Sequence, residues 1–304
     1  MFDLGRLRLL RELSQRGTMT AVAAASRLTP SAVSQQLATL EAEAAIKLFE
    51  PVGRRVRLTS AGLRLAAHAQ GILDAVEAAH VDMGIAATRP GGRLAIACFG
   101  TFAKSHMLPA VIRTRKRHVD IEIVVSELEP VDALDALRTG RCDAAIVYAH
   151  SLVPRSLDEG FVTRPLVEEP MLLALPRGYA HLPATVELTA FADCDWIGGA
   201  RESEGYTLAE RACAVAGFAP RITHSIDDYD LLLRMVAAGF GIGFVPQLAL
   251  DLYRTEGIVV RTPAGTALRR SISLVARPAV AASPSFLAVL EAFSSSPADR
   301  AGCR

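Results

Sequence analysis

The sequence predicts an α/β fold class, with a small helical head, one long connecting helix and a larger body of alternating strands and helices. Three observations favour it. Apolar residues recur at helical spacing between Leu4 and Ala44. A seven-residue apolar repeat then begins at Leu65. After Arg93, short apolar runs typical of buried strands alternate with helical patterns, as in sheets covered by helices.

Composition and charge describe a globular chain with a basic head. The 304 residues are 51% hydrophobic and 21% charged, which provides ample core material and suggests two or three domains. Residues 1–58 hold nine Lys or Arg and five Asp or Glu, a net charge of +4. The whole chain carries +1, so the remainder carries −3. A basic head on an acidic body is one indication of a polyanionic partner.

The sequence lacks the marks of several other protein classes. No apolar run reaches the roughly 18 residues of a membrane span, and the N-terminus has the pattern of an amphipathic helix rather than a signal peptide. The five cysteines show neither C-x-x-C spacing nor a histidine-paired pattern, so no metal site and no cofactor are expected. We therefore expect a cytoplasmic protein with reduced thiols and no membrane association.

Residues 1–58 have the pattern of three helices and a hairpin. Helices are predicted over 2–16, 21–26 and 30–44, with Gly17 ending the first and Thr20 capping the second. Thr29 is a good N-cap for the third, and Pro30 takes the first helical position, where its missing N–H costs nothing. Extended segments at 48–49 and 56–58 enclose a turn with Gly53, which predicts a hairpin. This order is that of a winged helix-turn-helix domain.

The third helix has one apolar face and one face of small polar residues. Its inward positions are Val33, Leu37, Leu40 and Ala44, and Ser31, Ser34 and Gln35 fall on the opposite side. A helix that enters the major groove needs side chains that bond base edges without bulk, and Ser and Gln are such side chains. An ordinary solvated helix face has the same period, so periodicity alone leaves both interpretations open.

Further DNA contacts are expected at the start of this helix and in the wing. N–H groups at a helix N-terminus point at phosphate, and wing arginines bond phosphates or enter the minor groove. The predicted DNA-binding residues are Thr29, Pro30, Ser31, Ser34, Gln35, Arg54, Arg55 and Arg57.

A linker helix is predicted within residues 59–90, reaching about residue 87. Its apolar stripe consists of Leu65, Ala69, Ile72, Val76, Ala79, Met83 and Ala86. A stripe of this length favours a partner helix from a second copy of the chain, hence a homodimer or homotetramer. Packing on its own body is the alternative. Arg89-Pro90-Gly91-Gly92 breaks the helix.

The body alternates strands with helices. Strands are expected at 94–99, 121–125, 144–148, 171–175, 196–198, 221–225 and 242–245, and helices at 105–116, 131–138, 208–216 and 231–238. This order predicts mostly parallel sheets, in two small lobes. Residues 295–304 have no apolar period and are expected to be disordered.

Several runs together resemble the LysR-type transcriptional regulators. In the head they are Ala32-Val33-Ser34, Gln36-Leu37, Leu40-Glu41, Leu48-Phe49, Gly53-Arg54-Arg55-Val56 and Leu58-Thr59-Ser60-Ala61-Gly62. In the body they are Leu108-Pro109, Leu137-Arg138-Thr139-Gly140, Asp143-Ala144-Ala145-Ile146 and the run 236–246. The resemblance covers nearly the whole chain. Departures at Ser26, Pro30, Ala45 and Pro51 concern the operator sequence rather than the fold.

The resemblance implies a function. Members bind inverted-repeat operators in double-stranded DNA as homo-oligomers, and a small-molecule effector modulates them from a cleft. The implied body is a periplasmic-binding-protein-like effector domain at 91–294, with lobe I at about 91–162 and 265–294 and lobe II at about 163–264. A solute-binding protein with an N-terminal extension that does not bind DNA is the alternative. An enzyme is not expected, because no G-x-S-x-G elbow surrounds Ser203 and the glycine run at 239–243 precedes a strand.

Effector contacts are expected where strands end and helices begin. The turn after the first strand offers Thr101 for a carboxylate and Phe102 for an apolar wall. Arg201 either pairs with an anionic effector or with Glu202 or Glu204, and Asp227 is expected to cap a helix. The predicted effector-binding residues are Gly100, Thr101, Phe102, Ser126, Glu127, His150, Gly199, Ala200 and Arg201.

Peroxide-sensing members of the resembled family use a cysteine pair in the second lobe. Cys194 and Cys213 lie in that part of the chain, and Cys213 sits within an Ala-rich helical pattern. We interpret both as buried structural thiols.

Overall fold

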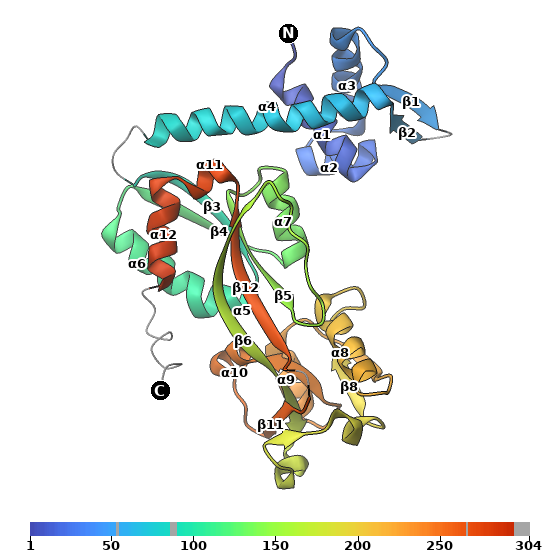
Figure 1. Ribbon diagram of the computed structural model, residues 1–304, viewed down its shortest axis with the longest axis vertical. Coiled ribbons are helices and arrows are strands. Elements are labelled where there is room, and N and C mark those ends of the chain that lie inside the picture. The colour runs from blue at the N-terminus through green and yellow to red at the C-terminus, as the bar shows by residue number, and fades with distance from the viewer. Residues whose placement is uncertain (53–54, 86–89, 266, 295–304) are drawn as a thin grey trace. The chain divides into compact units, whose positions relative to one another are not determined.

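A computed structural model describes residues 1–52, 55–85, 90–265 and 267–294 and confirms the α/β fold class (Figure 1). The chain divides into two compact units, Met1–Ala87 and Thr88–Arg304. The tail 295–304, for which we predicted disorder, and Ala86 of the linker stripe lie outside the described residues. No described helix combines the length and apolar character that crossing a membrane requires.

Three helices build the head: α1 (Leu4–Arg16), α2 (Met19–Ser26) and α3 (Pro30–Ala44). Gly17 ends α1 with a φ of 72°, a left-handed conformation that glycine adopts without cost. As predicted, the Thr29 side chain caps α3 by accepting a hydrogen bond from the N–H of Ala32. The cap of α2 was wrongly predicted: Thr18, not Thr20, accepts from the Ala21 N–H, because the helix begins two residues earlier than predicted.

The hairpin of β1 (Phe49–Val52) and β2 (Arg55–Leu58) is antiparallel, with Phe49 opposite Leu58. One carboxylate on α3 holds its entry in place. Glu41 Oε2 accepts from the backbone N–H of Leu48 at 2.8 Å and of Phe49 at 3.0 Å. The side-chain hydrogen bond from Lys47 lowers the pKa of Glu41 below its ordinary value. The hairpin is therefore tied to α3 by a charge-assisted contact.

The linker helix α4 spans Ser60–Ile85. A Cβ at Gly62 would lie 2.3 Å from the Leu48 carbonyl oxygen, so only glycine lets α4 approach the hairpin this closely. The first part of the predicted stripe packs on the head itself, since Leu65, Ala66 and Ala69 join its core. This contact with the head was not among the predicted partners of the stripe, which were a second copy of the chain or its own body. Ile72 is 38% exposed, and the side chain of Met83 is outside the description.

The first lobe of the body begins with the parallel strands β3 (Gly92–Cys98), β4 (Ile121–Glu127) and β5 (Ala144–His150). Its helical elements are α5 (Gly100–Phe102), a π-helical turn η1 (Ala103–Met107), α6 (Leu108–Arg117), α7 (Pro130–Arg138), α11 (Pro278–Ala281) and α12 (Pro284–Ser294). The π turn lies before Pro109, which has no N–H for the carbonyl one turn earlier.

Two long strands run through both lobes, as Figure 1 shows: β6 (Val162–Pro176) and β12 (Arg269–Ala276). The first half of β6 pairs with β12, and from Met171 it pairs with β10 (Gly243–Pro246) and β11 (Ile258–Pro263). The main sheet has the order β4-β3-β5-β12-β6-β11-β7, in which β7 is the short strand Thr185–Val186. The lobes thus share one continuous sheet, and β6 changes partners between Pro170 and Met171.

The second lobe packs around Trp196, which is fully buried. Its remaining elements are η2 (Arg177–His181), β7 (Thr185–Val186), η3 (Leu188–Phe191), β8 (Asp195–Gly198), α8 (Glu204–Val215), β9 (Arg221–Ser225), α9 (Tyr229–Ala237) and α10 (Gln247–Leu252). Strands β8 and β9 are parallel and form a separate two-stranded sheet. All strands and helices predicted for the body are present, with ends shifted by up to four residues, except that β6 begins nine residues before the predicted strand at 171–175. The prediction of mostly parallel sheets was wrong, because β12 pairs antiparallel with β5 and β6, and β10 and β11 pair antiparallel with β6.

Candidate functional site

The first candidate site is the outer face of α3. Val33 and Leu40 are fully buried and Leu37 nearly so, which fixes the rotation of the helix about its axis. As a result Ser31, Ser34 and Gln35 are exposed together. Thr29 Oγ1 lies 3.0 Å from Ser31 Oγ at the exposed start of the helix. The exposed face of α3 therefore carries short hydroxyl and amide side chains, as expected from the sequence.

The wing is described only in part. Arg54 lies outside the described residues, and for Arg55 the backbone in β2 is described but not the side chain. Arg57 is largely exposed and its guanidinium lies 2.6 Å from the Glu50 carboxylate. Exposed pairs of this kind contribute little to stability, so Arg57 can exchange Glu50 for a phosphate at small cost.

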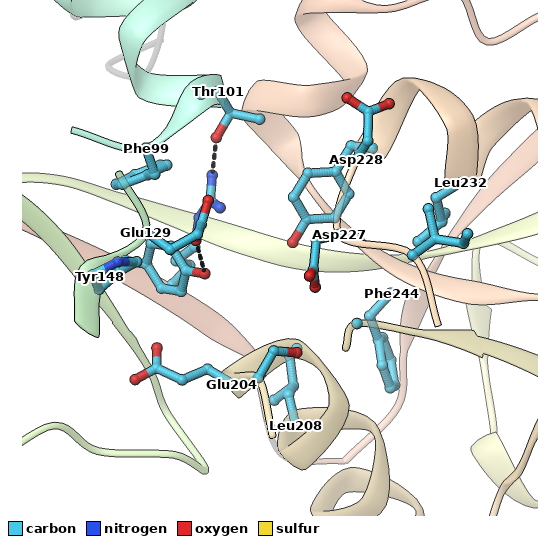
Figure 2. A pocket seen from close by; sticks show the side chains of 18 of the residues that line it. Phe99, Thr101, Glu129, Tyr148, Glu204, Leu208, Asp227, Asp228, Leu232 and Phe244 are labelled. Carbon is cyan, nitrogen blue, oxygen red and sulfur yellow. Dashed lines mark hydrogen bonds between the residues drawn. The ribbon is translucent and has the colours of Figure 1, made fainter. Parts of the chain in front are cut away.

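The second candidate site is a cavity of about 320 Å³ where the two lobes of the body meet. Its walls come from the ends of β3, β4 and β5, from β12, and from the starts of α8 and α9. Figure 2 shows side chains from these elements turned toward one open space. The size is at the lower end of the range for small-molecule sites.

The floor of this cavity is Arg270, whose side chain is 1% exposed. Its guanidinium lies 2.7 Å from Glu169, donates to Thr101 Oγ1 at 3.2 Å, and stacks over the rings of Phe99 and Tyr148 at 5.0 and 5.1 Å. Charge, hydrogen bonds and both ring faces thus hold Arg270 in one position.

Carboxylates from both lobes line the same cavity. Glu129 accepts a hydrogen bond from the Tyr148 hydroxyl at 3.0 Å, and Asp227 accepts from the Ala200 N–H at 2.8 Å. Glu204 pairs with Arg155. Burial raises the pKa of Glu129, and the charges of Asp227 and Glu127 raise it further, against the opposing hydrogen bond from Tyr148 and charge of Arg270.

Four of the predicted effector-binding residues line the cavity: Gly100, Thr101, Glu127 and Gly199. Gly100 has a steric reason to be glycine, since a Cβ there would lie 2.6 Å from Glu127 Oε1. Gly199 has a similar one, because a Cβ would lie 2.8 Å from Asp227 Oδ1. These two glycines let carboxylates approach the backbone.

The other five predicted residues do not line the cavity: Phe102, Ser126, His150, Ala200 and Arg201. Phe102 is fully buried in the core of the first lobe and stacks on His106, because a helical turn separates it from the strand end. The apolar wall is Phe99 instead. Arg201 is exposed, and the partner of Glu204 is Arg155 rather than Arg201. Ala200 does not line the cavity, but its backbone N–H donates a hydrogen bond to Asp227, which does.

His150 is buried beside the floor rather than in the wall. Its ring packs edge-on to Tyr148, and neither ring nitrogen has a hydrogen-bond partner among the described residues. Burial, with the charges of Arg270 and Arg155, lowers the pKa of His150 to about 3. The imidazole is therefore neutral.

At this site, the helix cap of α9 and the floor of the cavity differ from what the sequence predicts. Asp228, not Asp227, caps α9 by accepting from Leu231, which leaves Asp227 facing the cavity. Arg270 and Tyr148 carried no signal, because their places in the cavity follow from the pairing of β12 with β5, which lie far apart in the sequence. The Glu129-Pro130 pair at the start of α7 was the only local hint of a strand-to-helix turn.

The two cysteines of the second lobe differ in burial. Cys213 is fully buried, and burial raises its pKa to about 12, as expected for a structural thiol. Cys194 is only partly buried, and its Sγ lies 3.5 Å from the Tyr179 hydroxyl.

Comparison with protein families matches both units. Residues 4–63 match the bacterial regulatory helix-turn-helix protein family of the lysR type, and residues 87–297 match the LysR substrate binding domain. The DNA-binding transcriptional dual regulator OxyR of Escherichia coli is 31% identical over 254 residues, which are 81% of this chain and 80% of that protein. The nitrogen assimilation regulatory protein nac of Klebsiella aerogenes is 27% identical over 81% of this chain and 79% of its own.

Solved structures share the fold over the full length. A full-length OxyR variant from Pseudomonas aeruginosa has a TM-score of 0.64 at 20% identity, covering 98% of this chain and 96% of that one. Full-length CbnR in complex with its target DNA has a TM-score of 0.53 at 20% identity, and the match covers 96% of this chain and 99% of that one.

Proposed function

Since the chain belongs to the LysR family of DNA-binding transcriptional regulators, we propose that it binds an inverted-repeat operator as a homo-oligomer, in the cytoplasm, under the control of a small-molecule effector. The exposed hydroxyl and amide face of α3 is the observation that carries the DNA-binding part. Regulators of this family are not enzymes. The helix-turn-helix match at residues 4–63 favours this function over a solute-binding protein with an unrelated extension.

The roles within the head follow from the chemistry of its surface. Ser34 and Gln35 reach base edges in the major groove, where Gln can bond adenine at two positions. Thr29, Pro30 and Ser31, at the start of α3, and the wing arginines Arg54, Arg55 and Arg57 contact phosphates. CbnR, a protein of similar fold, has been solved with its target DNA, which supports DNA binding by a chain of this fold.

The body supplies the control. The two lobes share β6 and β12, and a ligand can bind between them. Such a ligand favours the arrangement of the lobes that it binds more tightly, and it shifts the equilibrium by its difference in affinity for the two arrangements. The predicted residues that lie where such a ligand would bind are Gly100, Thr101 and Glu127, on the first lobe, and Gly199, on the second. We place the effector in this cavity.

A gel-shift titration against the DNA upstream of its own gene tests the proposal. We expect a discrete complex at moderate salt that survives excess non-specific competitor. Ser34→Ala should weaken that complex, whereas Ser156→Ala, an exposed serine in the body, should not. If all bound DNA is lost to competitor for the wild type, specific operator binding is wrong.

A further inference from the structure

The wall of the cavity carries more negative than positive charge. Six acidic residues line it, Glu127, Glu129, Glu202, Glu204, Asp227 and Asp228, against three basic ones, Lys104, Arg155 and Arg270. The enclosed space, rather than the acids alone, marks the site, and the family match names this unit a substrate binding domain. The charge of the wall bears on what class of ligand fits.

The three basic side chains already have partners. Arg270 pairs with Glu169, which does not line the cavity, and Arg155 pairs with Glu204. Lys104 donates to the Tyr253 hydroxyl at 2.9 Å. Among the described residues, Glu129 and Asp227 form no ion pair with a basic side chain. Their hydrogen bonds come from a neutral hydroxyl and a backbone N–H. Two carboxylates from different lobes therefore lack a basic partner in direct contact.

These two carboxylates face the same space. Figure 2 shows Glu129 on the side of the first lobe and Asp227 on the side of the second, with the open cavity between them. Their charges act on one another, since Asp227 contributes to raising the pKa of Glu129. Glu204 adds a third acceptor, because its Oε2 is buried without a hydrogen-bond partner among the described residues. A ligand bound here must supply donors.

An apolar wall completes the site. Leu208, Leu232 and Phe244 line the side toward the second lobe, and Phe99 and Tyr148 line the side toward the first. A volume of about 320 Å³ holds a molecule of roughly amino-acid size. Charge at one end and apolar carbon at the other suit a short aliphatic chain with a charged head.

We infer that the effector of this protein is a small organic cation, an amine or guanidine with a short apolar stem, whose charged group binds between Glu129 and Asp227. This inference rests on the proposed function and names the ligand class of the same cavity. It differs from the anionic effector expected from Arg201, a residue that is exposed and does not line the cavity. Binding brings a cation between carboxylates of opposite lobes, so it favours their closer approach.

Matched probes of opposite charge test the inference on the full chain. 1,4-Diaminobutane and succinate share a four-carbon chain, and agmatine and L-arginine extend the cationic series against L-glutamate. We expect at least one cation to raise the unfolding temperature and to give saturable heat in calorimetry. Glu129→Gln and Asp227→Asn keep the local hydrogen bonds but lose the charge, and each should weaken that binding by about tenfold or more. Glu256→Gln removes an exposed charge that does not line the cavity, and it should leave cation binding unchanged.

The outcomes separate the ligand class from the proposed function. Stabilisation by succinate or glutamate instead of the cations overturns the inference, as does cation binding that survives unchanged in both cavity variants. Absence of binding by all three cations also overturns it. A gel shift on the same preparation is independent of these results, so specific DNA binding without any response to cations refutes the ligand class and leaves the regulator intact.

Discussion

Arg270 of β12 and Glu169 of β6 form an ion pair at 2.7 Å, with side chains only 1% and 4% exposed, at directly opposed positions on the two strands that run through both lobes. Glu169 also accepts from the N–H of Leu248 at 2.7 Å, at the start of α10. The pair therefore links a sheet, a helix of the second lobe and, through Thr101, the first lobe. It defines the floor of the cavity and the point where the lobes meet.

Removing one partner should leave the other buried without compensation. We expect Glu169→Gln to lower the free energy of unfolding of the body by about 3–5 kcal/mol, because Arg270 keeps its charge inside the protein. Urea unfolding followed by circular dichroism measures this. Glu168→Gln is the matched control on the same strand, since Glu168 is 55% exposed and pairs with exposed Arg269. Equal stability of both variants would contradict a structural role for the pair.

Thr101 should act through Arg270. Thr101→Val keeps the shape but removes the acceptor at 3.2 Å, which leaves a buried N–H unsatisfied and should cost about 1–3 kcal/mol of stability. It should also abolish the response to a cavity ligand. DNA affinity should stay unchanged, because Thr101 belongs to the unit Thr88–Arg304 and the helix-turn-helix belongs to the unit Met1–Ala87. Thr101→Ser retains the hydroxyl and should behave as wild type in thermal-shift titrations. A valine variant that still responds normally would exclude this role.

Glu129 should make stability depend on pH in a defined direction. Its pKa is raised in the folded protein, mainly by burial, so the folded state binds this proton more tightly than the unfolded state. The group's contribution to stability is greatest below its ordinary pKa and is lost as the pH rises through the raised value. Glu129→Gln should therefore raise the unfolding free energy of the ligand-free protein at neutral pH.

This gain should shrink as the pH falls and Glu129 itself becomes protonated. Denaturant unfolding at a series of pH values checks it, with Glu256→Gln as a control for loss of one exposed carboxylate. Cation binding should weaken over the same pH range in the wild type. A variant that is less stable than the wild type at neutral pH would show that Glu129 supports the fold rather than a ligand.

Local patterns predicted what depends on neighbouring residues. The spacing of Val33, Leu37 and Leu40 predicted which face of α3 is exposed. The Thr29-Pro30 pair predicted the first residue of α3 correctly. The strand and helix order of the body followed from alternating apolar runs. These features are encoded within a few turns of chain, so propensity and period suffice.

The cavity depended on contacts that local patterns do not carry. Arg270 meets Glu169 across 101 residues and Thr101 across 169, so neither contact has a local signature. The N-cap of α9 is Asp228, one residue after the predicted Asp227, which instead accepts from the Ala200 N–H and lines the cavity. The turn of α5 likewise carried Phe102 into the core and left Phe99 at the wall. Errors of one to three residues are harmless for a fold but decide which side chains face a ligand.

The central claim is that Ser34 and Gln35 read bases from α3, and binding to single-base-pair variants of one upstream fragment tests it most directly. Fluorescence anisotropy would compare the wild type with Ser34→Ala and Gln35→Ala across every substituted position. We predict that each variant loses about 1–3 kcal/mol of discrimination at one or two base pairs and keeps it elsewhere. Unchanged discrimination, or an equal loss of affinity on every sequence, would contradict the claim.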